Sequence, residues 1–271
     1  MLKIVVVGLG AISQALIPLL QAQPGLQLLG LLVRQGGNRK ARALLDSLQA
    51  AGQPTLRVAQ ALGDLPGAGL LVECAGHAAV AQHVLPVLAA GIPCVMASVG
   101  ALAEPDLAGR LEAAARVGGS RLHLVAGAIG AIDALAAARL GGLGAVVYTG
   151  SKPALAWRGT PADRQHDLAA LRAPTLIFDG SARQAALAYP QNANVAATLA
   201  LAGLGLDATR VQLVADPHSH ANTHHVKASG AFGEFELTMR GQPLAGNPKT
   251  SVLAVYSLLR AVLNHTSPIV V

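Results

Sequence analysis

Four histidines lie within eight residues, in the stretch DPHSHANTHHV at 216–226. Imidazole groups bind metal ions, carry protons in catalysis or make structural hydrogen bonds. A zinc site is disfavoured, because the sequence has no HExxH motif, no cysteine lies nearby and Asp216 is the only nearby acid. His218 and His220 precede the paired histidines in a proline-containing loop. We therefore expect no metal, and the roles of these two residues stay open.

Strand periodicity separates the two adjacent histidines. If 223–229 is a strand, His224 shares one face with Val226 and Ala228, and His225 lies on the opposite face. The apolar face is expected to point inward. A histidine with a pKa near neutrality suits proton transfer, so we predict that His224 is the catalytic acid–base. A hydrogen-bonded structural histidine is the alternative, and the role of His225 stays open.

A glycine turn opens the chain's first helical pattern. The sequence GLGAIS at 8–13 follows the apolar run 2–7, and it has the form G-x-G-x-x-G with Ser13 in the third glycine's place. The first glycine permits a tight turn, the second lets the backbone approach a pyrophosphate, and the helix N-terminus attracts phosphate. We predict dinucleotide binding, with a plain βα turn as the alternative. The predicted cofactor contacts here are Gly8, Gly10, Ala11 and Ile12.

The end of the second predicted strand has no acid to bind the adenosine ribose. The sequence VRQGGNRKARAL runs from Val33 without an acid before Asp46, and Arg34 stands at the expected position. A cation there suits the 2′-phosphate of NADP. A solvated basic loop is the alternative. We predict NAD or NADP, or both, with Arg34 in the cofactor site.

Polar residues in the second half supply further candidates. Asn192 and Asn194 follow Pro190 near a predicted helix start, where their amides suit a nicotinamide carboxamide or a substrate carboxylate, or cap the helix. Lys249 and Thr250 open the last predicted helix, a potential anion site, although Lys249 can equally be solvated. Asn192, Lys249 and Thr250 are the substrate-binding candidates.

Three further residues have open roles. Arg183 suits a carboxylate clamp or is exposed at the surface, Asp133 suits orienting a catalytic group or capping a helix, and His77 follows a core strand on the expected cofactor side of the sheet, where a catalytic role is one interpretation.

The first half contains apolar runs that alternate with helical patterns. Such runs are typical of strands in a parallel sheet with both faces covered. The expected strands are 2–7, 26–33, 70–74, 94–97 and 122–126, and the expected helices are 11–21, 38–51, 79–89 and 104–117. We therefore expect an α/β fold with an N-terminal Rossmann domain, a doubly wound parallel sheet.

The pattern changes after about residue 132. Phe235, Leu237 and Met239 alternate with polar residues, which indicates a sheet with one solvated face. The segment NPKTS places Asn247 as the N-cap and Pro248 as the first residue of a final helix. We expect a Rossmann domain at 1–129, completed by a C-terminal helix at 247–271, and an α+β mixed-sheet substrate domain at 130–246.

Composition narrows the functional class. The 271 residues are 52% hydrophobic, but the longest run without a charged residue, 74–103, is broken by polar residues and prolines, so we expect no membrane span. MLKIVVVGLG enters a strand directly, so we expect no signal peptide and a cytoplasmic location. The net charge of +6 comes without a Lys/Arg tract and with 3% aromatic residues, which disfavours nucleic acid and suits a small anionic substrate. We expect Cys74 and Cys94 to be buried and reduced, and the chain to be a homodimer.

Several stretches resemble the L-aspartate dehydrogenases, which share a Rossmann-plus-α/β plan with homoserine dehydrogenase and dihydrodipicolinate reductase. The matching stretches are ECAGHAAV from Glu73, SVGAL from Ser98, GAIGAIDAL from Gly127, GSARQAALAYPQNANVAAT from Gly180, DPHSHANTHHVKASGAFGEF from Asp216 and NPKTS from Asn247. The resemblance implies oxidative deamination of L-aspartate with NAD(P), giving iminosuccinate, which hydrolyses to oxaloacetate and ammonia or feeds NAD biosynthesis.

The resemblance also implies roles for single residues. Ala128 and Asn194 match cofactor-contacting positions, and His224 matches the active-site histidine. Ser13 and His225 depart from the family pattern. One alternative is another NAD(P)-dependent dehydrogenase or reductase of a small dicarboxylate or imine, and another is a non-catalytic NAD(P)-binding sensor.

The basic position after the second strand gives a first prediction. Arg34→Ala should weaken the binding of NADP more than that of NAD, because only NADP carries the 2′-phosphate. Titration of the purified protein with each cofactor measures both dissociation constants. Equal effects on the two constants would place Arg34 outside the adenosine site.

Overall fold

The computed structural model describes residues 1–34, 38–50, 56–190, 193–245 and 247–270. The chain divides into two compact units. Unit 1 comprises Met1–Ala101, Asp106–Val125 and Val255–Val271, and unit 2 comprises Leu102–Pro105 and Ala126–Ala254. No helix among the described residues is both long and apolar enough to cross a bilayer.

Unit 1 is built on a six-stranded sheet in which all strand pairs are parallel. The strands are β1 (Leu2–Val7), β2 (Leu26–Leu32), β3 (Arg57–Ala59), β4 (Leu70–Glu73), β5 (Cys94–Met96) and β6 (Leu122–Leu124). Their order, β3-β2-β1-β4-β5-β6, is that of a Rossmann domain. The predicted α/β class is confirmed. The short strand β3 is absent from the sequence prediction, because three residues are too few to establish a pattern.

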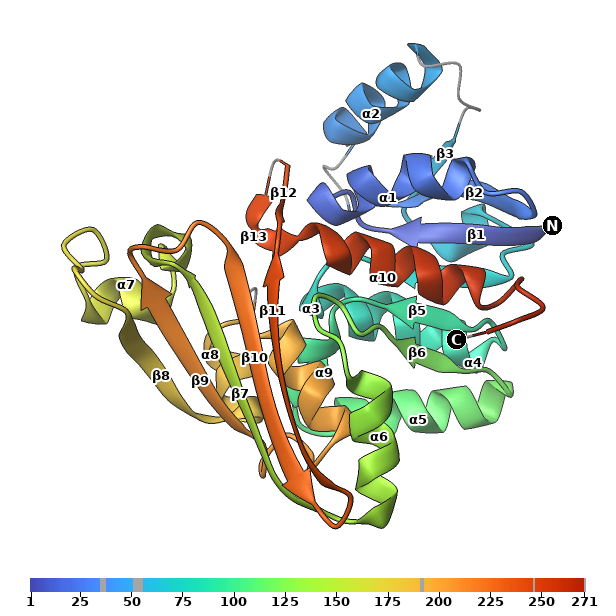
Figure 1. Cartoon of the computed structure of the whole chain (residues 1–271). Helices are drawn as coiled ribbons and strands as arrows, with labels where there is room; N and C mark the ends of the chain where they lie inside the picture. Colours follow the sequence, from blue (N-terminus) through green and yellow to red (C-terminus); the bar gives the residue numbers. More distant parts are fainter. Residues whose placement is uncertain (35–37, 51–55, 191–192, 246, 271) are drawn as a thin grey trace. The chain divides into compact units, whose positions relative to one another are not determined.

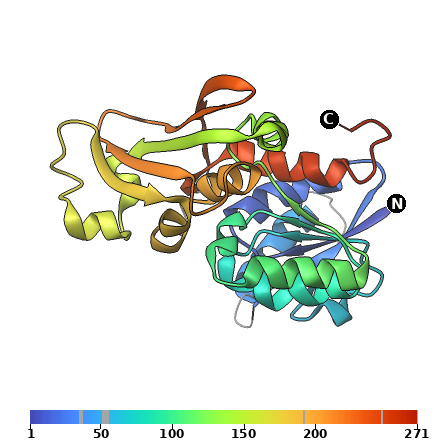
Figure 2. The same ribbon diagram turned by 90° about the horizontal axis from the view of Figure 1, so that it is seen from below.

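Helices cover both faces of this sheet, with α10 on one face and α5 on the other (Figure 2). Such double coverage explains why the central strands are largely apolar, since both faces of β4 and β5, and of β1 from Ile4 onward, are buried. The helices are α1 (Ala11–Gln21), α2 (Asn38–Ala50), α3 (His77–Ala79), which continues through a π-helical turn (Val80–Val84) into α4 (Leu85–Ala89), α5 (Leu107–Gly118) and α10 (Val252–Leu263), with 3₁₀ turns at Leu62–Asp64 and Val99–Ala103.

Unit 2 is built on a mixed five-stranded sheet of order β11-β10-β7-β9-β8 (Figure 1). Only the β7–β9 pair is parallel. The strands are β7 (Leu143–Pro153), β8 (Thr175–Ser181), β9 (Arg210–Asp216), β10 (Asn222–Gly230) and β11 (Gly233–Gly241). The predicted mixed-sheet domain is confirmed.

One face of the unit 2 sheet is covered by helices and the other is more polar. The helices α6 (Ile132–Gly141), α8 (Ala182–Ala188) and α9 (Asn194–Ala202) pack on one another and on the sheet (Figure 1). A 3₁₀ turn (Ala154–Trp157) and α7 (Pro161–Gln165) lie between β7 and β8. On β11, Phe235, Leu237 and Met239 are half-buried and their neighbours are exposed, so the predicted alternation is confirmed.

The predicted start of the last helix is wrong. Asn247–Ser251 forms strand β13, which pairs with β12 (Pro243–Leu244), and α10 begins only at Val252. The hydroxyl of Ser251 accepts a hydrogen bond from the N–H of Leu253 at 3.3 Å, which is the N-cap role that the sequence pattern assigned to Asn247. Pairing with a neighbouring strand therefore overrides the helix-start signal of the Asn-Pro pair.

Candidate cofactor and catalytic sites

The glycine turn of unit 1 has the two properties that its sequence predicts: a close approach of the backbone at Gly8 and open space at Gly10. Gly8 follows β1 with φ of +96°, and a Cβ there would lie 2.6 Å from Cα of Ala75. Gly10 is exposed and extended, and a Cβ there would meet no atom within 4 Å. The first position is thus filled by the protein's own backbone, and the second leaves room for a ligand. Ala11 and Ile12 begin α1 beside it, with no acid in the first turn to occupy the positive helix end.

Ser13 fits the position where the motif usually has a third glycine. Its side chain is fully buried and its hydroxyl donates to the carbonyl of Gly10 at 3.0 Å. The serine therefore ties the first turn of the helix to the glycine turn, so this departure from the motif leaves the turn intact.

A buried carboxylate organises the loops that follow β4 and β5. Glu73 is the last residue of β4 and is fully buried. Its oxygens accept hydrogen bonds from the N–H groups of Ala75 (2.7 Å) and Gly76 (2.9 Å). They also accept from the N–H (3.0 Å) and the hydroxyl (2.9 Å) of Ser98.

These loops meet the glycine turn at the point where the strand order reverses. In the sheet, β2 lies on one side of β1 and β4 lies on its other side. Open parallel sheets bind ligands outside the carboxyl ends of the strands at such a switch point. The contact of Gly8 with Ala75, which Glu73 holds, lies at this point. The backbone and the open space at Gly10 fit the pyrophosphate of a dinucleotide.

Other sequence candidates in unit 1 lie near this edge or are inert. Arg34 is exposed, two residues beyond β2. His77 is half-buried at the start of α3. Burial raises the pKa of the Cys74 and Cys94 thiols well above the ordinary value, with the charge of Glu73 adding to it, so both stay protonated.

In unit 2, His224 lies on the buried face of β10, as strand periodicity predicts. His224, Val226 and Ala228 are buried, whereas His225 is half-buried on the opposite face and Lys227 is exposed. The strand extends from Asn222 to Gly230, one residue beyond each end of the predicted one. The predicted alternation is confirmed.

The imidazole of His224 makes a short hydrogen bond to the adjacent strand. Its Nδ1 lies 2.7 Å from the hydroxyl of Tyr148 on β7, and both side chains are buried. The two rings are nearly parallel, with centroids 6.0 Å apart and an interplanar angle of 17°. The sequence did not identify Tyr148, because the pairing of β7 with β10 brings together residues 76 positions apart.

The pKa of His224 lies below the near-neutral range that best suits proton transfer. Burial, and to a smaller extent the nearby charge of Lys152, lower this pKa from 6.5 to about 4. Lys152 is itself only 4% exposed, and its Nζ lies 5.5 Å from the centroid of the Trp157 ring. His224 is therefore a neutral imidazole at neutral pH, next to a buried cation.

The remaining histidines of the cluster have separate partners. His218 Nε2 lies 2.9 Å from the carbonyl oxygen of Arg172, and His225 Nε2 lies 2.7 Å from a carboxylate oxygen of Glu236. His220 is exposed. Within the described part of the chain, no group of three or more His, Cys, Asp or Glu side chains is placed to hold a metal ion.

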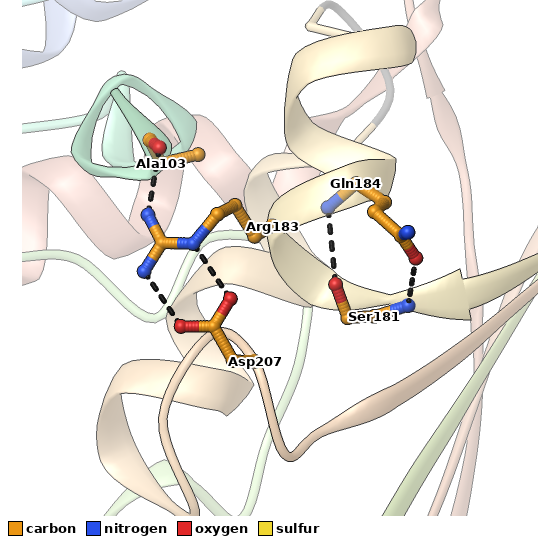
Figure 3. A network of polar contacts seen from close by, with 5 residues as sticks. All are labelled: Ala103, Ser181, Arg183, Gln184 and Asp207. Atoms are coloured by element: carbon orange, nitrogen blue, oxygen red, sulfur yellow. Dashed lines mark hydrogen bonds and ion pairs between the residues drawn. The ribbon is translucent and has the colours of Figure 1, made fainter. Parts of the chain in front are cut away.

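Arg183 binds the protein's own groups (Figure 3). Its Nε and Nη2 donate to the two carboxylate oxygens of Asp207 at 2.7 and 2.8 Å, and its Nη1 donates to the carbonyl of Ala103 at 2.8 Å. Ser181 and Gln184 form a capping box at the start of α8, the helix that contains Arg183. The hydroxyl of Ser181 accepts from the N–H of Gln184, and the side-chain oxygen of Gln184 accepts from the N–H of Ser181. Arg183 is half-buried and its guanidinium contacts the protein itself, a role that was not predicted from the sequence.

The other candidates of unit 2 are spread over several elements. Ala128 is buried, Asn194 begins α9, and Asp133 is exposed in the first turn of α6. Asn192 lies outside the described residues, as does the side chain of Lys249. The hydroxyl of Thr250 accepts from the amide of Asn247 at 3.1 Å. Lys249 and Thr250 belong to β13, so they do not open a helix, and their predicted role in substrate binding stays a prediction.

Comparison with known proteins gives the family. Residues 133–265 match the family described as aspartate dehydrogenase, C-terminal, and residues 8–125 match the NAD binding domain of homoserine dehydrogenase. An L-aspartate dehydrogenase of Pseudomonas aeruginosa is 58% identical over 269 residues, which cover 99% of each chain. Another, of Cupriavidus taiwanensis, is 56% identical and covers 98% of each chain. The chain belongs to the L-aspartate dehydrogenase family.

Solved structures agree with the assignment to this family. The crystal structure of aspartate dehydrogenase from Thermotoga maritima has a TM-score of 0.76 at 25% identity, covering 100% of this chain and 99% of that chain. A hyperthermophilic archaeal homoserine dehydrogenase in complex with NADPH has a TM-score of 0.58 at 12% identity, covering 98% and 97%. The dihydrodipicolinate reductase of Paenisporosarcina sp. has a TM-score of 0.52 at 14% identity, covering 96% and 94%. The last two share the fold, so the predicted common Rossmann-plus-α/β plan is confirmed.

In this member of the aspartate dehydrogenase family, the sequence contains a signal for two further residues that were not predicted, Glu73 and Lys152. Glu73 is an acid at the end of an otherwise apolar strand, LLVE, and a buried acid requires partners. Lys152 stands two residues from Gly150 in an alternating strand, on the face that is elsewhere buried. Glu73 lies in the predicted strand 70–74, whereas Lys152 lies in β7, for which no strand was predicted.

The two glycines of the turn should respond differently to alanine. Gly8→Ala should lower the free energy of unfolding by about 2 kcal/mol, because the positive φ and the contact with Ala75 both oppose a Cβ. Gly10→Ala should change it by less than about 0.5 kcal/mol and weaken NAD(P) binding roughly tenfold, a loss of about 1.4 kcal/mol. Chemical denaturation and cofactor titration measure the two effects. A lower free energy of unfolding for Gly10→Ala, together with unchanged cofactor binding, would refute the assignment of Gly10 to cofactor binding.

The buried histidine predicts a pH dependence of stability. The pKa of His224 is about 4 in the folded protein and near 6.5 when unfolded, so the unfolded chain takes up the proton first. The stabilisation is fully present above about pH 6.5 and is lost as the pH falls through 4. Between these values the wild type should lose about 3 kcal/mol more unfolding free energy than His224→Gln, at about 1.4 kcal/mol per pKa unit. Urea denaturation at several pH values tests this, and parallel curves would contradict it.

Proposed function

We propose that this chain oxidises L-aspartate with NAD or NADP to iminosuccinate, which water hydrolyses to oxaloacetate and ammonia. The observation that carries this proposal is the buried, neutral imidazole of His224 beside the cation of Lys152, in the unit that matches the aspartate dehydrogenase family. Relatives named L-aspartate dehydrogenase cover nearly the whole chain at more than half identity. The expected partners are therefore small molecules, and a cytoplasmic homodimer stays a prediction from the sequence.

His224 serves the proton transfers of this reaction. The nicotinamide, when bound, supplies the acceptor for the hydride from the substrate Cα. The substrate amine is an ammonium at neutral pH and must lose a proton before its nitrogen can form the imine. With a pKa of about 4 in the free protein, His224 is unprotonated and ready to accept that proton.

Lys152 connects the choice of substrate to the basicity of His224. A buried ammonium attracts an anion, and L-aspartate brings two carboxylates. A carboxylate near Lys152 would offset the smaller of the two causes that lower the pKa of His224, and would thereby raise this pKa in part, while the effect of burial stays. A dicarboxylate substrate therefore makes its own base stronger on binding.

The cofactor is held by unit 1 in this proposal. The turn at Gly8 and Gly10 and the N-terminus of α1 suit the pyrophosphate. Arg34, exposed after β2, suits a 2′-phosphate, so we infer that NADP is accepted alongside NAD. Ala128 and Asn194 are proposed to contact the cofactor because they match the family motif.

The direct test is a spectrophotometric assay of the purified protein with L-aspartate and each cofactor. We expect reduced nicotinamide to accumulate with L-aspartate. His224→Ala should lower kcat by roughly 10²–10⁴-fold, the usual size of lost acid–base catalysis, and should retain cofactor binding.

The same assay distinguishes the alternatives. Turnover of another small dicarboxylate or imine, with none of L-aspartate, would replace the substrate assignment. Cofactor binding without turnover of any amino acid or keto acid would favour a sensor. Normal turnover by His224→Ala would move the proton carrier to another residue.

A further inference from the structure

The hydrogen bond from β7 to His224 depends on an arrangement of two residues. Tyr148 and Gly150 lie two positions apart on β7, so their side-chain positions share one face. Gly150 stands directly opposite His224 in the β7–β10 register. The hydroxyl of Tyr148 reaches this neighbouring position, 2.7 Å from Nδ1 of His224.

Gly150 supplies the space that this reach requires. A Cβ at Gly150 would lie 2.7 Å from the Tyr148 hydroxyl oxygen, and 3.1 and 3.2 Å from two carbons of its ring. Its φ is outside the positive range, so the glycine is not needed for backbone conformation. Its role is to leave the place of a side chain to the tyrosine ring.

We propose that Tyr148 is a positioning residue for His224 and that Gly150 is the space that permits it. This inference rests on the proposed function in one respect: the oxidation of L-aspartate is the reaction in which the positioned imidazole of His224 would act. A hydroxyl both donates and accepts, so it can stay bonded to Nδ1 in each protonation state of the ring. Nε2 is then the ring nitrogen left to exchange a proton with substrate.

The properties of the tyrosine support positioning rather than proton transfer by the phenol itself. Tyr148 is only 1% exposed, and burial raises its pKa far above the ordinary value, so the hydroxyl keeps its proton throughout the working range. Catalytic bases are commonly held by a third group at their second nitrogen. Tyr148 has that relation to His224.

The first test is Tyr148→Phe, which keeps the ring and removes the hydroxyl. We expect kcat with L-aspartate to fall roughly 10- to 100-fold, the usual cost of losing an orienting partner, with KM changed by less than about threefold because the substrate contacts stay. Tyr189→Phe is the matched control. Tyr189 is also buried in unit 2, and its hydroxyl donates to the carbonyl of Ile177 at 3.4 Å, away from His224. Its kcat should stay within about twofold of wild type.

The second test asks whether Gly150 acts through the tyrosine. Gly150→Ala should displace the Tyr148 ring and lower kcat to a similar degree. The double variant should then be no slower than Tyr148→Phe alone, because both changes break the same hydrogen bond. Multiplied losses in the double variant would overturn the proposed role of Gly150.

A readout independent of turnover completes the design. Nitrogen-15 NMR of the imidazole of His224 reports its tautomer, and Tyr148→Phe should change the tautomer ratio whereas Tyr189→Phe should not. An unchanged ratio together with normal kcat would refute positioning, and so would a loss of thermal stability alone. A changed ratio in a protein that does not oxidise L-aspartate would refute the proposed function and leave the positioning intact.

Discussion

Both units depend on the same constraint: an ionisable side chain that is buried needs a hydrogen-bond partner within the protein. In unit 2, taking His224 out of water lowers its pKa to about 4, and the ring then needs a hydrogen-bond partner within the protein. Tyr148 provides that partner from the adjacent strand. The sheet keeps the two strands in register, so the chemistry of the imidazole follows from strand pairing.

Unit 1 uses the same physics with a carboxylate. Glu73 would be costly to bury alone, but four hydrogen bonds from two loops compensate it. Those bonds fix Ala75 against Gly8, where the glycine turn has no room for a side chain. The edge of the sheet proposed to hold the cofactor is thus shaped by a residue that need not touch the cofactor.

Much of the fold was predictable because it follows from periodicity. Continuous apolar strands indicated the parallel sheet, and alternation placed His224 inward and His225 outward. The failures came from interactions between segments distant in sequence. The contact of Tyr148 with His224 depends on the pairing of β7 with β10, and the helix-cap pattern at Asn247 carries no sign that β13 pairs with β12. The pKa of His224 likewise depends in part on the charge of Lys152. A strand pattern can assign Lys152 to a face of the sheet, but it cannot give the distance from Lys152 to His224.

The division of the chain has a consequence for its biosynthesis. The polypeptide passes between the units at four points, after Ala101, Pro105, Val125 and Ala254. Unit 1 takes its last segment, Val255–Val271, from the end of the chain, and Arg183 holds the inserted segment Leu102–Pro105 through Ala103. During translation, unit 2 can therefore be complete before unit 1, although unit 1 begins first. Unit 1 gains α10 only after the segments of unit 2 have been synthesised, and each unit combines segments that are separated in the sequence, so neither unit is one continuous fragment.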